Sequence, residues 1–300
     1  MTLTNLGVPR ATRTVVSWPR PARIDGSIGT ILLDAGRLDA GGLESILRAQ
    51  KEKSLRFGEA GMGLGLLTQD DIDFALARQF DYPYLIAGDD RISRDVVAAF
   101  KPFSPVVEQL RVLRSQLMLR WFSGEPGHKA LAITSAGRRE GRSFIAANLA
   151  LVFSQLGART LLVDADLRHS SQAGLFRLAQ PAGLSSLLAA RAGREAIVPI
   201  APMPNLSVLP AGPAPPNPQE LLGRPAFGQL LQAVAEDFDV ILIDTPAARY
   251  YADADTIAAR AGAAIVLARR HVTSAPDLAQ LGRSVQQAGA VLVGSVLNDA

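Results

Sequence analysis

Short apolar runs alternate with helical stretches from Lys129 onward, and this alternation limits the fold more than any other feature of the sequence. The runs are apolar throughout, as in strands that are buried between two layers of helices. Strands alternating with helices predict an α/β fold with a doubly wound parallel sheet. We expect strands at 130–135, 160–168, 206–212, 239–246, 263–269 and 290–298, and helices at 143–155, 218–236 and 275–288.

The segment between the first strand and the first helix, Ser135–Phe144, reads SAGRREGRSF. Its spacing is that of a phosphate-binding P-loop, in which backbone amides and a helix N-terminus face the phosphates. Arg142 replaces the usual lysine, and Ser143 lies where a hydroxyl ligates Mg²⁺. The pattern predicts a nucleotide site made by Ala136, Gly137, Arg138, Arg139, Glu140, Gly141, Arg142, Ser143 and Phe144.

Three acidic residues come at the ends of later strands, namely Asp164 and Asp166 after one strand and Asp244 after another. The carboxyl ends of parallel strands meet at one edge of a sheet, so these carboxylates are expected beside the loop. One such acid alone would be read as a helix cap. Three together repel one another unless a cation is present, and Mg²⁺ on a polyphosphate supplies it. We therefore predict a Mg²⁺ site of Ser143, Asp164, Asp166 and Asp244.

A helix is expected over 103–121, with Ser104 as its cap and Pro105 as its first residue. Glu108, Arg111 and Arg114 lie three residues apart on one face of it, where Glu108 is able to pair with Arg111. By itself this spacing is typical of a solvated face.

These motifs together resemble the bacterial tyrosine autokinases, or BY-kinases, of exopolysaccharide assembly. The resemblance rests on Glu108-x-x-Arg111-x-x-Arg114, the loop at 136–143, LLVDADLR at 161–168 and ILIDTP at 241–246. It covers roughly residues 103–298. It implies a P-loop NTPase fold of the BY-kinase and MinD type, and an ATP-dependent protein-tyrosine kinase that regulates exopolysaccharide chain length and export.

The resemblance also implies a role for each matching residue. Arg142 and the loop amides would hold the β- and γ-phosphates, with Arg168 in the same nucleotide site. Asp164 would accept the proton of the attacking tyrosine. Mg²⁺ would be served by Ser143 and Asp166, and through water by Asp244. In ring-forming relatives, the residues matching Glu108, Arg111 and Arg114 contact the neighbouring subunit.

Two departures from the family keep other functions open. Arginine at 142 keeps the charge of lysine but is longer and planar, and the chain ends without the family's cluster of tyrosines. The tyrosines present are Tyr82, Tyr84, Tyr250 and Tyr251. The last two follow Asp244 closely and are candidates for modification, although we expect structural or rim residues there. One alternative is a catalytically weak nucleotide switch. Another is a ParA/MinD-type ATPase, although Arg138 and Arg139 stand where those proteins carry a lysine.

The N-terminal part contains a repeat with an offset of 29 residues, which indicates duplicated supersecondary units. Ser27–Gln50 and Arg56–Gln79 each predict a short helix, a glycine turn and a second helix, with Asp39 and Thr68 as N-caps. The repeat resembles the N-terminal domain of type II secretion and pilus-assembly ATPases (MshEN-like).

In one branch of that family the repeated motif binds cyclic di-GMP. The matching positions are Arg56, Phe57, Gly58, Gly65, Leu67 and Gln79 in the second copy, and Gly29, Gly36 and Gln50 in the first. Ser27 replaces the arginine of the first copy, which removes a planar charge suited to guanine or phosphate. The alternative is a docking domain in which the glycines serve only helix packing.

Composition limits the remaining possibilities. The chain of 300 residues has no cysteine, which excludes disulfides and thiolate metal sites, and its net charge of +3 is too small to indicate nucleic acid. No apolar run is long enough to span a membrane.

The expected organisation is a flexible basic tail (1–25), a repeat domain (26–92) and a kinase-like domain (97–300). Fusion of the two domains resembles the EpsG branch, which implies a cytoplasmic protein at the inner membrane whose partner is a membrane chain-length determinant (a polysaccharide co-polymerase).

Overall fold

The computed structural model describes residues 26–80, 83–85, 88–179, 182–201 and 203–299, and the expected tail at 1–25 lies outside them. The chain divides into two compact units, Met1–Asp81 and Tyr82–Ala300. In the described residues no helix is both long and apolar enough to cross a membrane.

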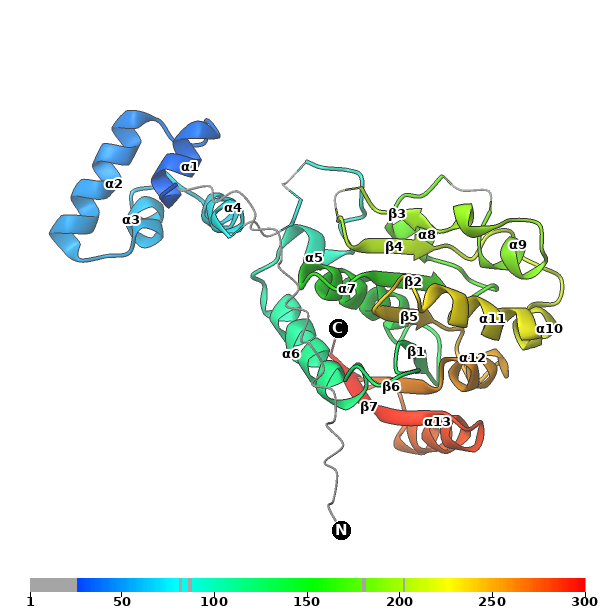
Figure 1. The fold of residues 1–300 in the computed structure, drawn as a ribbon. Helices are drawn as coiled ribbons and strands as arrows, with labels where there is room; N and C mark the ends of the chain where they lie inside the picture. Colours follow the sequence, from blue (N-terminus) through cyan, green and yellow to red (C-terminus); the bar gives the residue numbers. More distant parts are fainter. Residues whose placement is uncertain (1–25, 81–82, 86–87, 180–181, 202, 300) are drawn as a thin grey trace, which may run out of the picture. The chain divides into compact units, whose positions relative to one another are not determined.

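The first unit confirms the predicted repeat of two helix pairs (Figure 1). The glycine between the helices has a positive φ in both copies, 66° at Gly36 and 70° at Gly65, so both turns need the left-handed backbone that glycine adopts easily. The helices are α1 (Ile28–Asp34), α2 (Ala40–Lys53), α3 (Phe57–Gly63) and α4 (Gln69–Gln79).

Local contacts explain why each copy begins and packs as it does. Asp39 Oδ1 accepts a hydrogen bond from the Gly42 amide at 2.6 Å, and Thr68 Oγ1 accepts one from the Asp71 amide at 3.3 Å, so both predicted N-caps are confirmed. A Cβ on Gly29 would lie 2.6 Å from Leu43 Cδ1. In the second copy, Gly58 packs on Ile72 in the same way. These glycines therefore serve close helix packing.

The second unit contains a seven-stranded sheet in the order β3-β4-β2-β5-β1-β6-β7, parallel except for the β3–β4 pair. Its strands are β1 (Ala130–Ser135), β2 (Thr160–Asp164), β3 (Val198–Pro199), β4 (Leu206–Leu209), β5 (Val240–Asp244), β6 (Ala263–Arg269) and β7 (Val291–Asn298). Its helices are α5 (Val97–Phe100), α6 (Pro105–Arg120), α7 (Arg142–Gln155), α8 (Gln172–Leu175), α9 (Leu184–Leu188), η1 (Arg194–Ala196), α10 (Pro218–Gly223), α11 (Pro225–Val234), α12 (Asp253–Ala261) and α13 (Ala275–Gln287).

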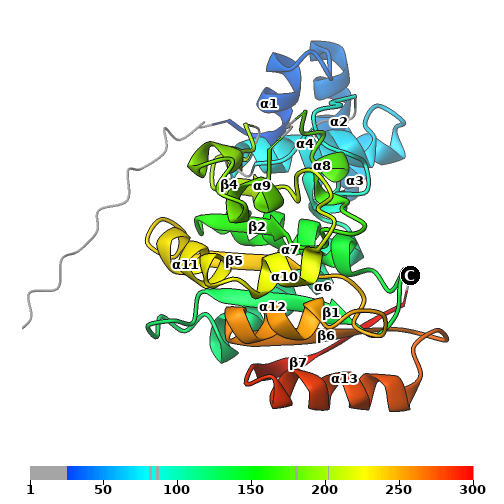
Figure 2. The ribbon, with the colours of Figure 1, turned by 90° about the vertical axis from the view of Figure 1, so that its right-hand side faces the viewer.

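Side chains that alternate along the strands form two cores, one on each face of the sheet. Leu131 and Ile133 of β1 join the core under α5, α6 and α7, whereas Ala130 and Ala132 join the core under α10–α13. Figure 1 shows α7 against the sheet, and in Figure 2 the helices α10–α13 face the viewer. The predicted doubly wound α/β sheet is confirmed, and its order brings the ends of β2, β5 and β1 side by side.

Three boundaries differ from those expected. The helix at 218–236 is divided into α10 and α11, since Pro225 begins a new helix and disfavours helical backbone before it. The expected strand at 160–168 ends at Asp164. The unit boundary lies at 81/82 and not at 92, because the Leu85 amide donates to Ala99 O (2.6 Å) and Ile92 is buried in the same core as α7.

Candidate active site

The loop after β1 leads into α7 through Gly141, as the sequence predicts. Gly141 has a φ of 96°, and a Cβ there would lie 2.3 Å from Asn298 Nδ2. Glu140 is buried and ties the loop down, since its carboxylate accepts hydrogen bonds from the Gly137 amide (2.8 Å) and from the Thr273 hydroxyl (2.5 Å). The loop is therefore held by β7 and by the segment after β6. Sequence spacing alone could not reveal these partners.

Arg142 is folded onto its own loop. Its Nε donates to Thr245 O at 2.8 Å, and its Nη1 donates to Gly137 O at 2.7 Å and to Ser135 Oγ at 2.5 Å. The side chain is 8% exposed, so these charge-assisted bonds lie largely out of water, where they are stronger. A bound phosphate would have to compete for this guanidinium with two backbone carbonyls and one serine hydroxyl.

The strands bring Asp164 and Asp244 together, because the two residues are paired in register at the ends of β2 and β5. Burial, and then the charge of Asp244, raise the pKa of Asp164 to about 8, although the Gln172 and Ser171 amides stabilise its charged form. Burial raises the pKa of Asp244 to about 6, against the opposite effect of Ser143, Gln172 and Arg142. A pair of buried carboxylates with raised pKa values is typical of functional sites.

Asp166 lies in the same cluster, and Gln172 links the other two acids. Asp166 Oδ1 accepts hydrogen bonds from the Arg168 and His169 amides. Gln172 is fully buried, with its amide donating to Asp164 Oδ2 (2.9 Å) and its Nε2 to Asp244 Oδ2 (2.7 Å). Sequence reasoning missed Gln172, because nothing in its local pattern connects it to β5.

The cluster fits a divalent cation that is also bound to phosphate. Among the described residues, no group of three or more His, Asp or Glu side chains could hold a metal by itself. However, Asp244 Oδ1 is buried and lacks a hydrogen-bond partner, which is costly unless a missing ligand satisfies it. Carboxylate and hydroxyl oxygens are suitable ligands for Mg²⁺, which commonly combines one or two carboxylates with substrate phosphates.

A pocket of about 380 Å³ opens beside the loop. It brings together loop residues, Asp166 and residues that follow β2 and β5. The pocket is lined by Arg138, Arg139, Arg142, Ser143, Asp166, His169, Ser171, Pro246, Ala247 and Tyr251. The predicted Arg168 lies next to it and is held at 2.7 Å by buried Asp253.

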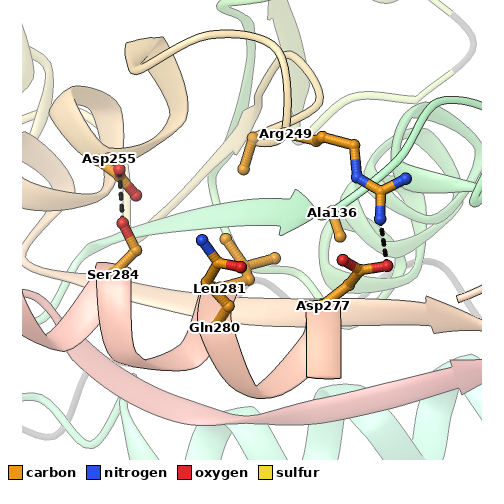
Figure 3. Close-up of a pocket in the computed structure, with 8 residues that line it drawn as sticks. Ala136, Arg249, Asp255, Asp277, Gln280, Leu281 and Ser284 are labelled. Carbon is orange, nitrogen blue, oxygen red and sulfur yellow. Dashed lines mark hydrogen bonds and ion pairs between the residues drawn. The ribbon is translucent and has the colours of Figure 1, made fainter. Parts of the chain in front are cut away.

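A smaller pocket of about 160 Å³ lies next to Ala136, the first residue of the loop pattern (Figure 3). Arg249 pairs with Asp277 on one side of it, and Ser284 donates to Asp255 at 2.7 Å on the other. Its charged groups are therefore paired with one another.

The predicted motif Glu108-x-x-Arg111-x-x-Arg114 lies on α6. Glu108 and Arg111 form an ion pair at 2.9 Å, as expected. Arg114 Nη1 donates to Val152 O of α7 at 3.1 Å, so this residue also fixes α6 on the nucleotide helix. Ser104 precedes α6 but makes no capping hydrogen bond, and its hydroxyl is buried without a partner.

The fold and the loop define a P-loop nucleotide-binding protein of the α/β class. The Bacillus subtilis (strain 168) tyrosine-protein kinase YwqD is 33% identical over 208 residues, which are 69% of this chain and 87% of that protein. The chain therefore belongs to the bacterial tyrosine-protein kinases.

Solved structures agree with this assignment. The kinase domain of Escherichia coli tyrosine kinase ETK is matched with a TM-score of 0.65 and 30% identity, over 68% of this chain and 80% of that one. The chimerical protein CapA2B2 is matched with a TM-score of 0.64 and 30% identity, over 77% of this chain and 98% of that one. No family model matches the chain.

Proposed function

We propose that this protein is an ATP-dependent protein-tyrosine kinase. The observation that carries the proposal is the pairing of a P-loop with two buried carboxylates, Asp164 and Asp244, at the ends of adjacent strands. Phosphoryl transfer needs mainly positioning and charge stabilisation, and this arrangement offers both.

Each residue then has a role in the reaction. The loop amides and the N-terminus of α7 bind the phosphates of ATP. Arg142 leaves its carbonyl acceptors and pairs with the β- and γ-phosphates, and Arg168 stabilises the same site. Ser143, Asp166 and Asp244 are the residues that would hold Mg²⁺, which supplies positive charge to the transferring phosphoryl group when bound.

Asp164 is proposed to accept the proton of the tyrosine hydroxyl. Burial raises its pKa above that of an ordinary aspartate, so its ionised form binds a proton more strongly. Gln172 holds Asp164 and Asp244 in place through its amide and side chain. Gln172 is therefore a positioning residue.

The chain's physiological role is proposed from the family resemblance. We expect the kinase to regulate the chain length and export of an exopolysaccharide, in contact with a membrane chain-length determinant at the cytoplasmic face of the inner membrane. Self-association would use Glu108, Arg111 and Arg114. For Arg114, this requires a role beyond its present bond to α7.

The first unit is proposed to bind cyclic di-GMP through the second repeat, in the manner of EpsG-like and MshEN-like domains. Support comes from the matching turns at Gly36 and Gly65 and from Arg56, which is exposed at the start of α3. The same turns suit a docking domain, which is the alternative for this unit.

A second function is favoured by one specific observation. The three hydrogen bonds of Arg142 stabilise the loop without nucleotide, so ATP binding would be coupled to their loss. This coupling is what a catalytically weak nucleotide switch requires. A ParA/MinD-type ATPase shares the fold, but family membership favours the kinase.

Incubation of the purified chain with labelled ATP and Mg²⁺ tests these functions. A kinase forms phosphotyrosine, on itself or on an added Glu-Tyr copolymer, and Asp164→Asn abolishes it. Hydrolysis of ATP with no phosphotyrosine would contradict the proposal and favour the MinD-type reading. Tight ATP binding with neither product would contradict it and favour the switch.

A further inference from the structure

Tyr251 occupies an unusual position for a tyrosine on a loop after β5. Of the described tyrosines Tyr84, Tyr250 and Tyr251, only Tyr251 lines the pocket that also contains Ser143 and Asp166. It is half-buried, whereas neighbouring Tyr250 is 52% exposed. The ring therefore lies in the pocket where ATP is proposed to bind.

Two arginines from different segments fix this tyrosine. The Arg168 guanidinium lies 3.9 Å from the centre of the Tyr251 ring, a cation–π contact. Arg168 is itself anchored by buried Asp253. Arg138, which belongs to the P-loop, donates from Nη2 to the Tyr251 hydroxyl at 3.3 Å.

This arrangement suits a tyrosine that gains a phosphate. Arg138 already contacts the oxygen that would carry the new group, and a guanidinium binds a phosphate more strongly than a neutral hydroxyl. Arg168 orients the ring without occupying its hydroxyl. The Tyr250 ring lies farther from a guanidinium, at 5.2 Å from Arg138, and 6.3 Å from the Tyr251 ring.

We infer that Tyr251 is the autophosphorylation site of this chain and receives the phosphoryl group within its own molecule. The inference rests on the proposed kinase function. The Tyr251 oxygen forms a bond to the γ-phosphorus as the bond from that phosphorus to the β–γ bridging oxygen breaks. ADP leaves, and the phenol proton passes to Asp164. The product is a phosphotyrosine whose phosphate pairs with Arg138.

The phosphorylated residue would also change the pocket. A phosphate on Tyr251 would place about two negative charges at neutral pH beside Asp166, close to the site of the phosphates of ATP. It would hold Arg138 away from nucleotide. We therefore expect the modified chain to bind a fresh ATP at least threefold more weakly than the unmodified chain.

Mapping of the phosphate tests the inference. Cleavage after arginine leaves Tyr250 and Tyr251 in one peptide, 250–260, so single variants are needed to separate them. After incubation of the full chain with Mg²⁺ and ATP, we expect the label in the wild type and in Tyr250→Phe, and at least a fivefold loss in Tyr251→Phe. Tyr251→Phe should keep the wild-type melting temperature, which shows that it is folded, and the wild type should phosphorylate a Glu-Tyr copolymer in a parallel reaction. In Tyr250→Phe, phosphotyrosine in this peptide lies on Tyr251 alone.

Transfer within one molecule has its own test. Wild type is mixed with an Asp164→Asn chain of different mass, and only the wild type should carry phosphate. Label on the Asp164→Asn chain, label on another peptide, or full label in Tyr251→Phe would overturn the inference. A wild type that phosphorylates the copolymer but not Tyr251 overturns this inference alone, whereas failure on both substrates overturns the proposed function as well.

Discussion

Replacement of Asp164 by asparagine is expected to stabilise the nucleotide-free protein above pH 6. Asp164 is an acid whose pKa is raised in the folded state, from 3.8 to about 8. The folded state therefore binds a proton that the unfolded state has lost, and stability falls as pH rises between these two values. Asparagine does not ionise, so the variant lacks this loss.

The magnitude follows from the size of the pKa shift. A shift from 3.8 to about 8 corresponds to roughly 6 kcal/mol at most, at about 1.4 kcal/mol per pH unit. Less is expected in practice, because asparagine also disturbs the bonds from the Ser171 and Gln172 amides. We expect a gain of about 2 kcal/mol at pH 8, or roughly 4–8 °C in Tm for a unit of this size.

Urea unfolding at pH 6, 7 and 8 measures this effect. Buried Trp121 reports on the second unit through its bond to Ala130 O, in a Trp18→Phe background that removes the other tryptophan. The wild-type midpoint should fall with rising pH, and that of Asp164→Asn should remain nearly constant over this range. Asp166→Asn is the matched control and should keep the wild-type slope, because Asp164 is still present. An equal slope in Asp164→Asn would refute the reasoning.

Three further predictions concern the loop and the repeat. Arg142→Lys should leave ATP turnover unchanged or raise it by up to about tenfold, because it weakens the bonds to the loop carbonyls. A large loss of turnover, measured by ADP release, would show that arginine is adapted to its task. Gly141→Ala should lower stability by about 1–3 kcal/mol and weaken ATP binding more than tenfold, because its Cβ would meet Asn298 and its φ is positive; unchanged melting and nucleotide titration would contradict this. Calorimetry should detect binding of cyclic di-GMP to the wild type and to Arg48→Ala, an exposed control on α2, but not to Arg56→Ala. Absence of heat from the wild type at high micromolar ligand would exclude the site.

Features determined by nearby residues could be predicted from the sequence. The caps at Asp39 and Thr68, the turns at Gly36 and Gly65 and the entry into α7 through Gly141 all depend on a few adjacent residues. The single helix expected at 218–236 was wrong, because Pro225 favours a helix start and disfavours helical backbone before it.

Contacts between distant segments could not be predicted in the same way. Gln172 donates a hydrogen bond to Asp244 of β5, which lies 72 residues away in the sequence. Arg168 pairs with Asp253, which lies 85 residues away. The acceptors of Arg142 are backbone carbonyls, whose positions depend on how β1 and β5 pair. Sequence motifs therefore indicated candidate residues for the site, and the fold determined which groups hold them.

The central claim is that ATP bound at this P-loop is used to phosphorylate tyrosine. The most direct test measures ADP and phosphotyrosine in one reaction of the full chain with Mg²⁺, ATP and a Glu-Tyr copolymer. The account predicts close to one phosphotyrosine, on the chain or the copolymer, for each ADP released, and neither product in Asp164→Asn. Release of ADP and inorganic phosphate with no phosphotyrosine would contradict it.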